Sequence, residues 1–212
     1  MISRRNLLLS LPIFAIGNSF SQNQKQGKNM KNILIISGHP DLEKSVSNAT
    51  ILDEFSKKLP EAKIRKLSEL YPDYKIDVKA EQEAVLTADI LVWQFPFYWY
   101  STPALMKKWI DDVFLYGFAY GSQAKIKGKK LLISISTGAD ENSYKKEGFM
   151  QHEMKDYFAG FESTAILCGL DLLKVMYVNG MNSIGKDEAT IKQLKEKAIS
   201  YADSVIEVLK NA

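Results

Sequence analysis

The sequence is poor in the residues that build disulfides and metal sites. Its 212 residues contain one cysteine, Cys168, and two histidines, so an internal disulfide is impossible and a zinc-type Cys/His ligand set is excluded. There are only 6 prolines and 12 glycines, which excludes a collagen-like or low-complexity chain. Basic residues number 28 and acidic residues 25, so the chain lacks the clustered positive field of a nucleic-acid-binding protein.

Apolar residues are plentiful enough for a sizeable core. Hydrophobic residues make up 46% of the chain and charged residues 25%, as in an ordinary globular domain. At 24.0 kDa the chain has room for one domain with short appendages.

The first 21 residues have the order of an export signal. Arg4 and Arg5 precede an apolar run over residues 7–16, which is well short of the roughly 20 residues that span a bilayer. The segment Ser3–Leu8 resembles the twin-arginine signal, although an arginine pair also precedes ordinary secretory signals. We expect cleavage near Ser21 and export to the periplasm. The alternative is an N-terminal extension on a cytoplasmic protein.

The signal is followed by a polar linker and then by the domain. Residues 22–30 hold Gln, Asn, Lys and Gly and no apolar side chain before Met30, so we expect a solvated spacer. Cleavage would remove two arginines and no acidic residue, leaving a net charge of +1. The predicted domain covers residues 31–212.

From Lys31 onward, short apolar runs alternate with longer amphipathic stretches, a pattern typical of βαβ units. The runs predict strands at 33–36, 62–67, 90–93, 131–135 and 172–178. Helical periodicity predicts helices at about 46–59, 79–88, 102–115, 151–168 and 187–210, the third beginning with Thr102 as N-cap and Pro103 in the first turn. We therefore predict an α/β fold with a doubly wound, five-stranded parallel sheet of order 2-1-3-4-5. In such sheets ligands bind at the carboxyl ends of the strands, here at the loops after strands 1, 3 and 4.

The first of these loops resembles a phosphate cradle. It runs from Ser37 into a helix, and Ser45, Ser47 and Asn48 offer short polar side chains beside the free N–H groups of the helix N-terminus. The spacing is neither that of a dinucleotide-binding glycine motif nor that of a P-loop. Taken alone, Ser45 could simply cap the helix, and His39 could be a solvated loop residue.

The second loop is aromatic, reading Phe95-Pro96-Phe97-Tyr98-Trp99-Tyr100. Because a loop at a ligand-binding edge is normally polar, this density favours stacking on a flat aromatic ligand. The third loop contains Thr137, which offers a hydroxyl, and Gly138, which allows a ligand to approach the backbone closely.

The segment from Gln94 to Phe114, followed by Gly117-Phe118-Ala119-Tyr120, resembles the flavodoxin-like NAD(P)H:quinone oxidoreductases. That family includes DT-diaphorase, bacterial drug-activity modulators and the ancillary oxidoreductase of glutathione-gated potassium efflux. The resemblance implies a flavodoxin-like doubly wound sheet, FMN or FAD as cofactor, and NAD(P)H as electron donor. It also implies a quinone or other small acceptor, a homodimer, and two-electron hydride transfer by a ping-pong mechanism.

The resemblance also assigns site residues. The phosphate loop would be His39, Ser45, Val46, Ser47 and Asn48, the isoalloxazine would be lined by Pro96, Phe97, Trp99 and Tyr100, and its pyrimidine edge would meet Thr137 and Gly138. Tyr144 matches the catalytic tyrosine. Ala139 replaces a second glycine of the family, and His152 is displaced from the place of a catalytic histidine in the eukaryotic enzymes.

Two other functions are compatible with this fold. The protein could be a regulatory or electron-carrying flavoprotein without turnover, although one-electron carriers of this fold tend to be strongly acidic. Alternatively, the aromatic loop could bind another protein, without any flavin.

Overall fold

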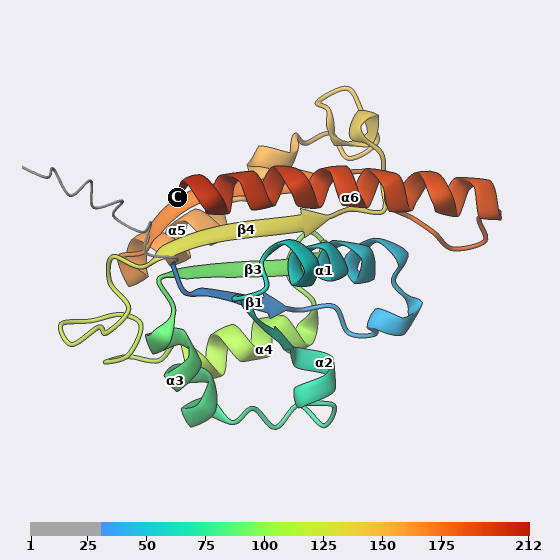
Figure 1. Cartoon of the computed structure of the whole chain (residues 1–212). Helices are drawn as coiled ribbons and strands as arrows, with labels where there is room; N and C mark the ends of the chain where they lie inside the picture. Colours follow the sequence, from blue (N-terminus) through green and yellow to red (C-terminus); the bar gives the residue numbers. More distant parts are fainter. Residues whose placement is uncertain (1–30) are drawn as a thin grey trace, which may run out of the picture. The chain divides into compact units, whose positions relative to one another are not determined.

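The computed structural model describes residues 31–212, which form one unit (Figure 1). The predicted export signal (1–21) and linker (22–30) lie outside the described residues.

A five-stranded parallel sheet forms the centre of the domain. Its strands are β1 (Ile33–Ser37), β2 (Lys63–Lys66), β3 (Ile90–Pro96), β4 (Lys130–Ser136) and β5 (Asp171–Val178). The order is β2-β1-β3-β4-β5 and every pairing is parallel, which confirms the predicted topology. Strand β3 is buried along its whole length, as its unbroken apolar run predicts.

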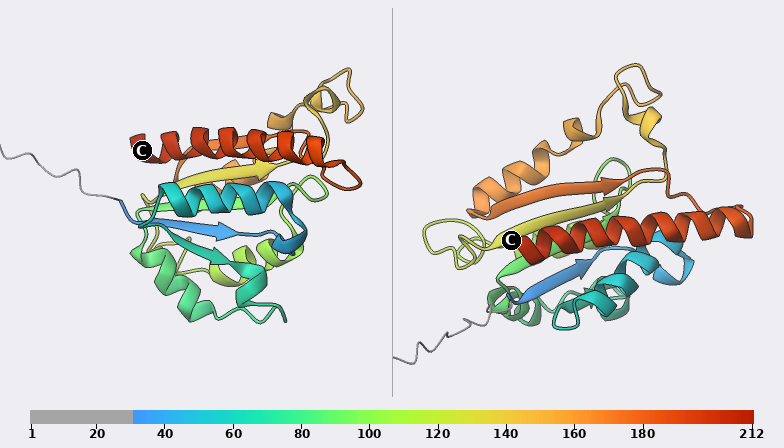
Figure 2. Two further views of the ribbon diagram at one scale, coloured as in Figure 1. Left: turned by 45° about the vertical axis from the view of Figure 1, so that its right-hand side comes forward. Right: turned by 45° about the horizontal axis from the view of Figure 1, so that its top comes forward.

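Helices cover both faces of the sheet (Figure 2). One face carries α1 (Val46–Lys58) and α6 (Glu188–Asn211), and the other carries α2 (Leu67–Leu70), α3 (Val78–Thr87), α4 (Ala104–Val113) and α5 (Ala159–Cys168). Short 3₁₀ turns, η1 (Leu42–Lys44), η2 (Glu141–Tyr144) and η3 (Met154–Tyr157), lie in the loops. Successive side chains of a strand enter opposite cores: Leu34 and Ile36 pack under α4, and Ile35 packs under α1 and α6. Within residues 31–212 no helix is long and apolar enough to cross a membrane.

Three local predictions are corrected by the structure. Helix α2 was not predicted, and it forms because Leu67 is drawn into the core directly after β2. The predicted helix over 151–168 is helical only from Ala159, since η3 and a turn precede it. Pro103 is the N-cap of α4 rather than its first residue, because its extended backbone (ψ 154°) delays the first turn to Ala104.

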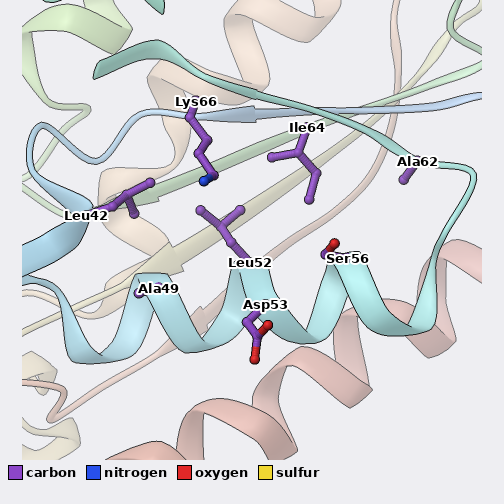
Figure 3. Close-up of a pocket in the computed structure, with 8 residues that line it drawn as sticks. All are labelled: Leu42, Ala49, Leu52, Asp53, Ser56, Ala62, Ile64 and Lys66. Atoms are coloured by element: carbon purple, nitrogen blue, oxygen red, sulfur yellow. The ribbon is translucent and has the colours of Figure 1, made fainter. Parts of the chain in front are cut away.

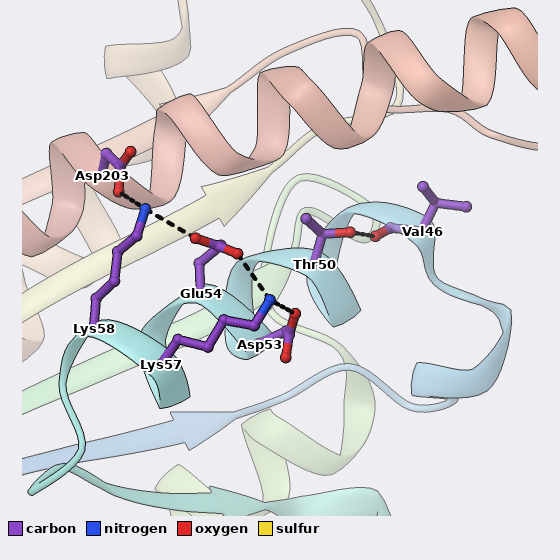
Figure 4. A network of polar contacts seen from close by, with 7 residues as sticks. All are labelled: Val46, Thr50, Asp53, Glu54, Lys57, Lys58 and Asp203. Atoms are coloured by element: carbon purple, nitrogen blue, oxygen red, sulfur yellow. Dashed lines mark hydrogen bonds and ion pairs between the residues drawn. The ribbon is translucent and has the colours of Figure 1, made fainter.

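Ion pairs fasten α1 to α6 (Figure 4). The Lys58 ammonium lies 2.9 Å from Glu54 in its own helix and 2.5 Å from Asp203 of α6. The bond from Lys58, with a smaller contribution from Lys57, holds the pKa of Glu54 below its usual range. The C-terminal turn of α1 is thus tied to α6.

A buried carboxylate joins β2, α3 and α4. Glu81 of α3 is fully buried and accepts hydrogen bonds from Arg65 Nε (2.7 Å), the Tyr71 hydroxyl (2.5 Å) and Trp109 Nε1 (2.9 Å). The arginine compensates the buried charge, and the other two donors satisfy the remaining lone pairs. This cluster sets the position of α4, the helix that follows the aromatic loop.

Candidate functional site

The three predicted loops meet at the carboxyl edge of the sheet. Backbone hydrogen bonds join them in sequence across the edge, from Gly38 N to Gln94 O (2.8 Å), from Phe97 N to Ser136 O (2.8 Å) and from Thr137 N to Val178 O (2.9 Å). The first residue of each loop is thus hydrogen-bonded to the neighbouring strand, which fixes where the loop begins. The loop after β5 also joins the edge.

The loop after β1 ends in an open helix N-terminus. The Ser45 hydroxyl caps α1 by accepting a hydrogen bond from Asn48 N at 3.1 Å. Among residues 31–212, the N–H groups of Val46 and Ser47 and the Ser47 hydroxyl have no hydrogen-bond partner. These donors lie at the positive end of the helix dipole, so they fit an anion such as a phosphate.

His39 contributes to this loop as a neutral ring. It is 9% exposed, and its Nδ1 accepts a hydrogen bond from Asp41 N at 3.0 Å. Burial lowers the pKa of His39, and the neighbouring Asp41 raises it by a smaller amount. Because Nδ1 is an acceptor, the ring carries its proton on Nε2 and can donate from there.

Asn48 has its side chain directed into the protein. Its amide nitrogen donates to the hydroxyls of Ser45 (3.2 Å) and Ser136 (3.1 Å), so both amide hydrogens are used internally. Of the five predicted phosphate-loop residues, Asn48 therefore has no side-chain donor left for a ligand.

The aromatic loop contains a tight, strained turn. Tyr98 and Ser101 exchange two backbone hydrogen bonds (3.1 and 3.0 Å), and both residues between them, Trp99 (φ +48°) and Tyr100 (φ +63°), are left-handed. That conformation is unfavourable for bulky residues, and such strain is concentrated at functional sites. Trp99 is 92% exposed and has no ring contact among the described residues, whereas Pro96 is buried at the end of β3.

Tyr157 is the centre of an aromatic cluster that the sequence did not reveal. It stacks on Tyr100 (ring centroids 5.2 Å apart, planes 13° apart) and meets Phe97, Tyr144 and His152 edge-on at 5.6, 6.2 and 5.9 Å. The predicted helix over 151–168 hid this residue, because an aromatic side chain on a helix face usually packs into the core. The cluster joins the second and third loops.

Tyr144 ends η2 and is 8% exposed. Burial raises the pKa of Tyr144, while a hydrogen bond with the Thr137 hydroxyl lowers it by a smaller amount. The hydroxyl is therefore protonated at neutral pH and available as a donor. His152 does not reach Tyr144: it contacts Tyr157 and lies 3.8 Å from the Asp156 carboxylate, with 63% of its side chain exposed.

Thr137 and Gly138 form a backbone edge beside this cluster. The Thr137 hydroxyl lies 2.8 Å from Ala139 O and 2.9 Å from Asn179 Oδ1, which ties the loop to the one after β5. A Cβ added at Gly138 would meet only the Asn182 Cβ, at 3.8 Å, so the space beside it is open. That space suits the close approach of a planar ligand.

A separate cavity of about 460 Å³ lies between α1 and the edge strand β2 (Figure 3). Leu52 and Ile64 form its apolar floor, and Lys66 and Asp53 lie at its rim. None of the predicted cofactor residues lines it. The cavity touches the loop after β1 at Leu42 but lies apart from the predicted cofactor residues.

Comparisons with known proteins show the family to which the fold belongs. A family model described as a flavodoxin-like fold matches residues 31–202. The chain is 46% identical to the glutathione-regulated potassium-efflux system ancillary protein KefF of Enterobacter sp. (strain 638), over 66% of this chain and 79% of the relative. It is 36% identical to the uncharacterized NAD(P)H oxidoreductase YrkL of Bacillus subtilis (strain 168), over 81% and 97% of the two chains.

Two solved structures are also similar. General stress protein 14 of Treponema denticola, solved in complex with FMN, superposes with a TM-score of 0.75 at 32% identity, covering 84% of this chain and 99% of the other. An NADPH-quinone reductase from P. pentosaceus superposes with a TM-score of 0.67 at 27% identity, covering 81% and 97%.

Proposed function

The chain belongs to the flavodoxin-like fold family, and from that membership we propose that it is an FMN-dependent oxidoreductase that transfers hydride from NAD(P)H to a quinone or a related small acceptor. Relatives named as an NAD(P)H oxidoreductase and an NADPH-quinone reductase support the reaction class. The FMN held by the Treponema protein supports the cofactor.

The observation that carries this proposal is the open N-terminus of α1 beside the aromatic loop. The free N–H groups of Val46 and Ser47, with the Ser45 and Ser47 hydroxyls, would bind the cofactor phosphate. His39 would add its Nε2 proton. A phosphate site and a flat aromatic wall at one sheet edge fit a flavin nucleotide better than a docking protein.

The remaining predicted residues would hold the ring system. Phe97, Trp99 and Tyr100 would line the isoalloxazine, and Thr137 with Gly138 would meet its pyrimidine edge. When bound, the flavin supplies two-electron hydride chemistry, with donor and acceptor using one site in alternate half-reactions. Closing that site against water would require Trp99 and Tyr100 to cover the ligand.

We assign the proton-donating role to Tyr144. Its hydroxyl is buried, protonated and part of the cluster that includes Tyr100 and Tyr157. From there it would donate a hydrogen bond to the acceptor oxygen as negative charge develops. His152 contacts neither Tyr144 nor Thr137, so the proposal gives it no part in proton transfer.

We further propose a homodimer. Three large aromatic side chains, Trp99, Tyr116 and Phe149, are 92%, 71% and 86% exposed in the single chain. A second copy of the chain would cover these side chains, and aromatic residues are enriched in protein interfaces. Light scattering of the flavin-loaded protein measures this directly, and a monomer at micromolar concentration would contradict it.

The proposed activity is tested in two steps on the full-length protein. The first is absorbance of the purified, FMN-incubated and desalted chain, followed by extraction and identification of the cofactor. The second is steady-state oxidation of NADH and NADPH with and without a soluble quinone. Protein that stays colourless contradicts flavin binding. Flavin-loaded protein that oxidises neither nucleotide supports the alternative of an electron-carrying or regulatory flavoprotein.

A further inference from the structure

A buried polar cluster lies beneath the first turn of α1. Its members, Ser45, Asn48, Gln94 and Ser136, come from α1 and from the ends of β3 and β4, and none is more than 8% exposed. Gln94 is completely buried, although the strand around it is otherwise apolar. A polar side chain at such a position needs a reason beyond packing.

The hydrogen bonds of this cluster run in one direction in the structure. Gln94 Nε2 donates to Asn48 Oδ1 at 3.0 Å. The carbonyl oxygen of Asn48 is thereby held toward Gln94, and its amide nitrogen faces the Ser45 hydroxyl at 3.2 Å. If Asn48 alone were turned over, its amide nitrogen would face Gln94 Nε2. The other amide atom of Gln94, Oε1, is buried without a hydrogen-bond partner among residues 31–212, so the bond to Asn48 is the one polar contact of this side chain.

Ser45 is then left with one possible role toward a ligand. A hydroxyl has two acceptor lone pairs and one proton. Both lone pairs of Ser45 are taken, one by Asn48 N (3.1 Å) and the other by Asn48 Nδ2 (3.2 Å). Its proton is therefore free to be donated away from the cluster, at the open end of α1.

We propose that Gln94 is a positioning residue for the phosphate of the cofactor: it sets the orientation of Asn48 and, through Asn48, makes Ser45 a hydrogen-bond donor to the ligand. This inference rests on the proposed function, because the anion is taken to be a flavin phosphate. Gln94 itself does not touch the ligand. We call this chain of hydrogen bonds the relay: it runs from Gln94, near the end of β3, through Asn48 to Ser45 at the N-terminus of α1.

A nearly isosteric replacement, Gln94→Glu, reverses the relay. An ionised carboxylate can only accept, so at a pH high enough to ionise this buried group Asn48 turns its amide nitrogen toward residue 94 and its oxygen toward Ser45. Ser45 then donates its proton inward and no longer to the phosphate. The neutral variant Gln94→Met removes the donor without adding charge, so that neither orientation of Asn48 is imposed.

The test compares FMN with riboflavin, which lacks the phosphate. Dissociation constants are measured by flavin fluorescence for the full-length wild type, Gln94→Glu and Gln94→Met. We expect the preference for FMN over riboflavin to fall about tenfold to a hundredfold in Gln94→Glu, the usual worth of a hydrogen bond to a charged group. Riboflavin affinity should stay unchanged, whereas a general structural defect would weaken both ligands.

A double-mutant cycle with Ser45→Ala separates the relay from a simple charge effect. In the wild type this change should lower FMN affinity by the same factor; in Gln94→Glu it should add almost nothing, because the hydroxyl is already turned away. A full additional loss would show that Glu acts only through its charge and would overturn the relay. If Gln94→Glu does not fold, the same cycle is run with Gln94→Met, in which Ser45→Ala should lower FMN affinity by a smaller factor than in the wild type; an equal factor would overturn the relay.

Ser136→Ala is the matched control. It removes the other acceptor of the Asn48 amide (3.1 Å) from the same buried cluster but leaves the bond from Gln94 in place. The ratio of FMN to riboflavin affinity should not change, and a change equal to that of Gln94→Glu would overturn the proposal. A wild type that binds neither flavin overturns the proposed function itself, which is a different result from additive effects in a protein that binds FMN.

Discussion

At the scale of single residues, a substitution at Tyr144 can separate the role of the hydroxyl in proton donation from the role of the ring in packing. The change Tyr144→Phe removes one hydroxyl and leaves the ring against Tyr157. We expect unchanged FMN affinity and a rate of quinone reduction lowered by roughly 10² to 10⁴, the usual contribution of a positioned general acid. Stopped-flow traces of both half-reactions measure it.

Tyr157→Phe is the control for this change, because it keeps the stacking on Tyr100 and also removes one hydroxyl of the cluster. It should reduce quinone at the wild-type rate. Equal rates for all three proteins would mean that Tyr144 only forms part of the wall.

His39 predicts a pH dependence of stability. Burial lowers its pKa in the folded state below the ordinary value of 6.5, so the unfolded chain binds a proton more readily. The free energy of unfolding should therefore fall as the pH drops below 6.5, and the fall should end once the folded-state pKa is passed.

The measurement is urea unfolding between pH 7.5 and 5, with His39→Asn as the reference. Asparagine can still accept the hydrogen bond from Asp41 N but does not titrate. The variant should lose less stability over this range than the wild type. Parallel curves would contradict the assignment of His39 as a buried neutral ring.

At the scale of elements, the backbone of the turn after β3 is strained, and we expect ligand binding to compensate for this strain. Trp99 has φ +48° but its ring is 92% exposed, so it costs backbone energy without packing in return. Trp99→Gly should stabilise the flavin-free protein by about 1 kcal/mol, since glycine adopts this conformation freely.

Trp99→Ala is the matched variant, because alanine keeps the Cβ that causes the strain and should not raise Tm. Both variants should bind FMN more weakly, by about 1 to 3 kcal/mol if the ring is buried on the cofactor. Thermal melts with and without FMN separate the two effects. A glycine variant that melts below the alanine variant without flavin would contradict stored strain.

The Glu81 cluster gives a second prediction at this scale. In Glu81→Gln the half-buried Arg65 loses its counter-charge, and one amide hydrogen is brought against Trp109 Nε1. Breaking a buried ion pair from one side costs about 3 to 5 kcal/mol, so a clearly lower urea midpoint is expected. Glu83→Gln makes the same chemical change on the exposed side of α3 and should have almost no effect.

At the scale of the whole molecule, the predicted signal and the proposed cofactor constrain each other. A noncovalent flavin can be carried across a membrane only inside a folded protein, which favours the twin-arginine route over the export of unfolded chains. We propose that the chain folds around FMN in the cytoplasm and is then exported and cleaved near Ser21. Cell fractionation should find flavin-loaded, shortened protein in the periplasm.

The variant carrying Arg4→Lys and Arg5→Lys keeps the charge of the segment and removes the arginine pair. It should remain full-length in the cytoplasm with its flavin bound. If it is exported equally well, or if the wild type stays cytoplasmic and uncleaved, a cytoplasmic oxidoreductase is the better description.

The sequence by itself determined the sheet and the edge at which the candidate site is proposed. Unbroken apolar runs such as Ile33–Ile36 belong to strands buried on both faces, and five strands alternating with helices favour a doubly wound sheet of the flavodoxin-like order 2-1-3-4-5, which the structure confirms. The same rule brings the loops after strands 1, 3 and 4 to one edge. These conclusions depend on local patterns, which a single sequence contains in full.

Only the tertiary structure decided what each side chain does at that edge. Tyr157 lies far along the chain from the ring of Tyr100 on which it stacks, and Gln94 reaches Asn48 from another strand. The inward direction of Asn48 has no periodic signature, because it follows from contacts with Gln94 and Ser136 on distant strands. The left-handed turn at Trp99 has none either, since aromatic residues are not typical of that conformation. Hydrogen-bond direction and ring stacking depend on distances of a few ångströms, and those distances exist only once the layers have packed.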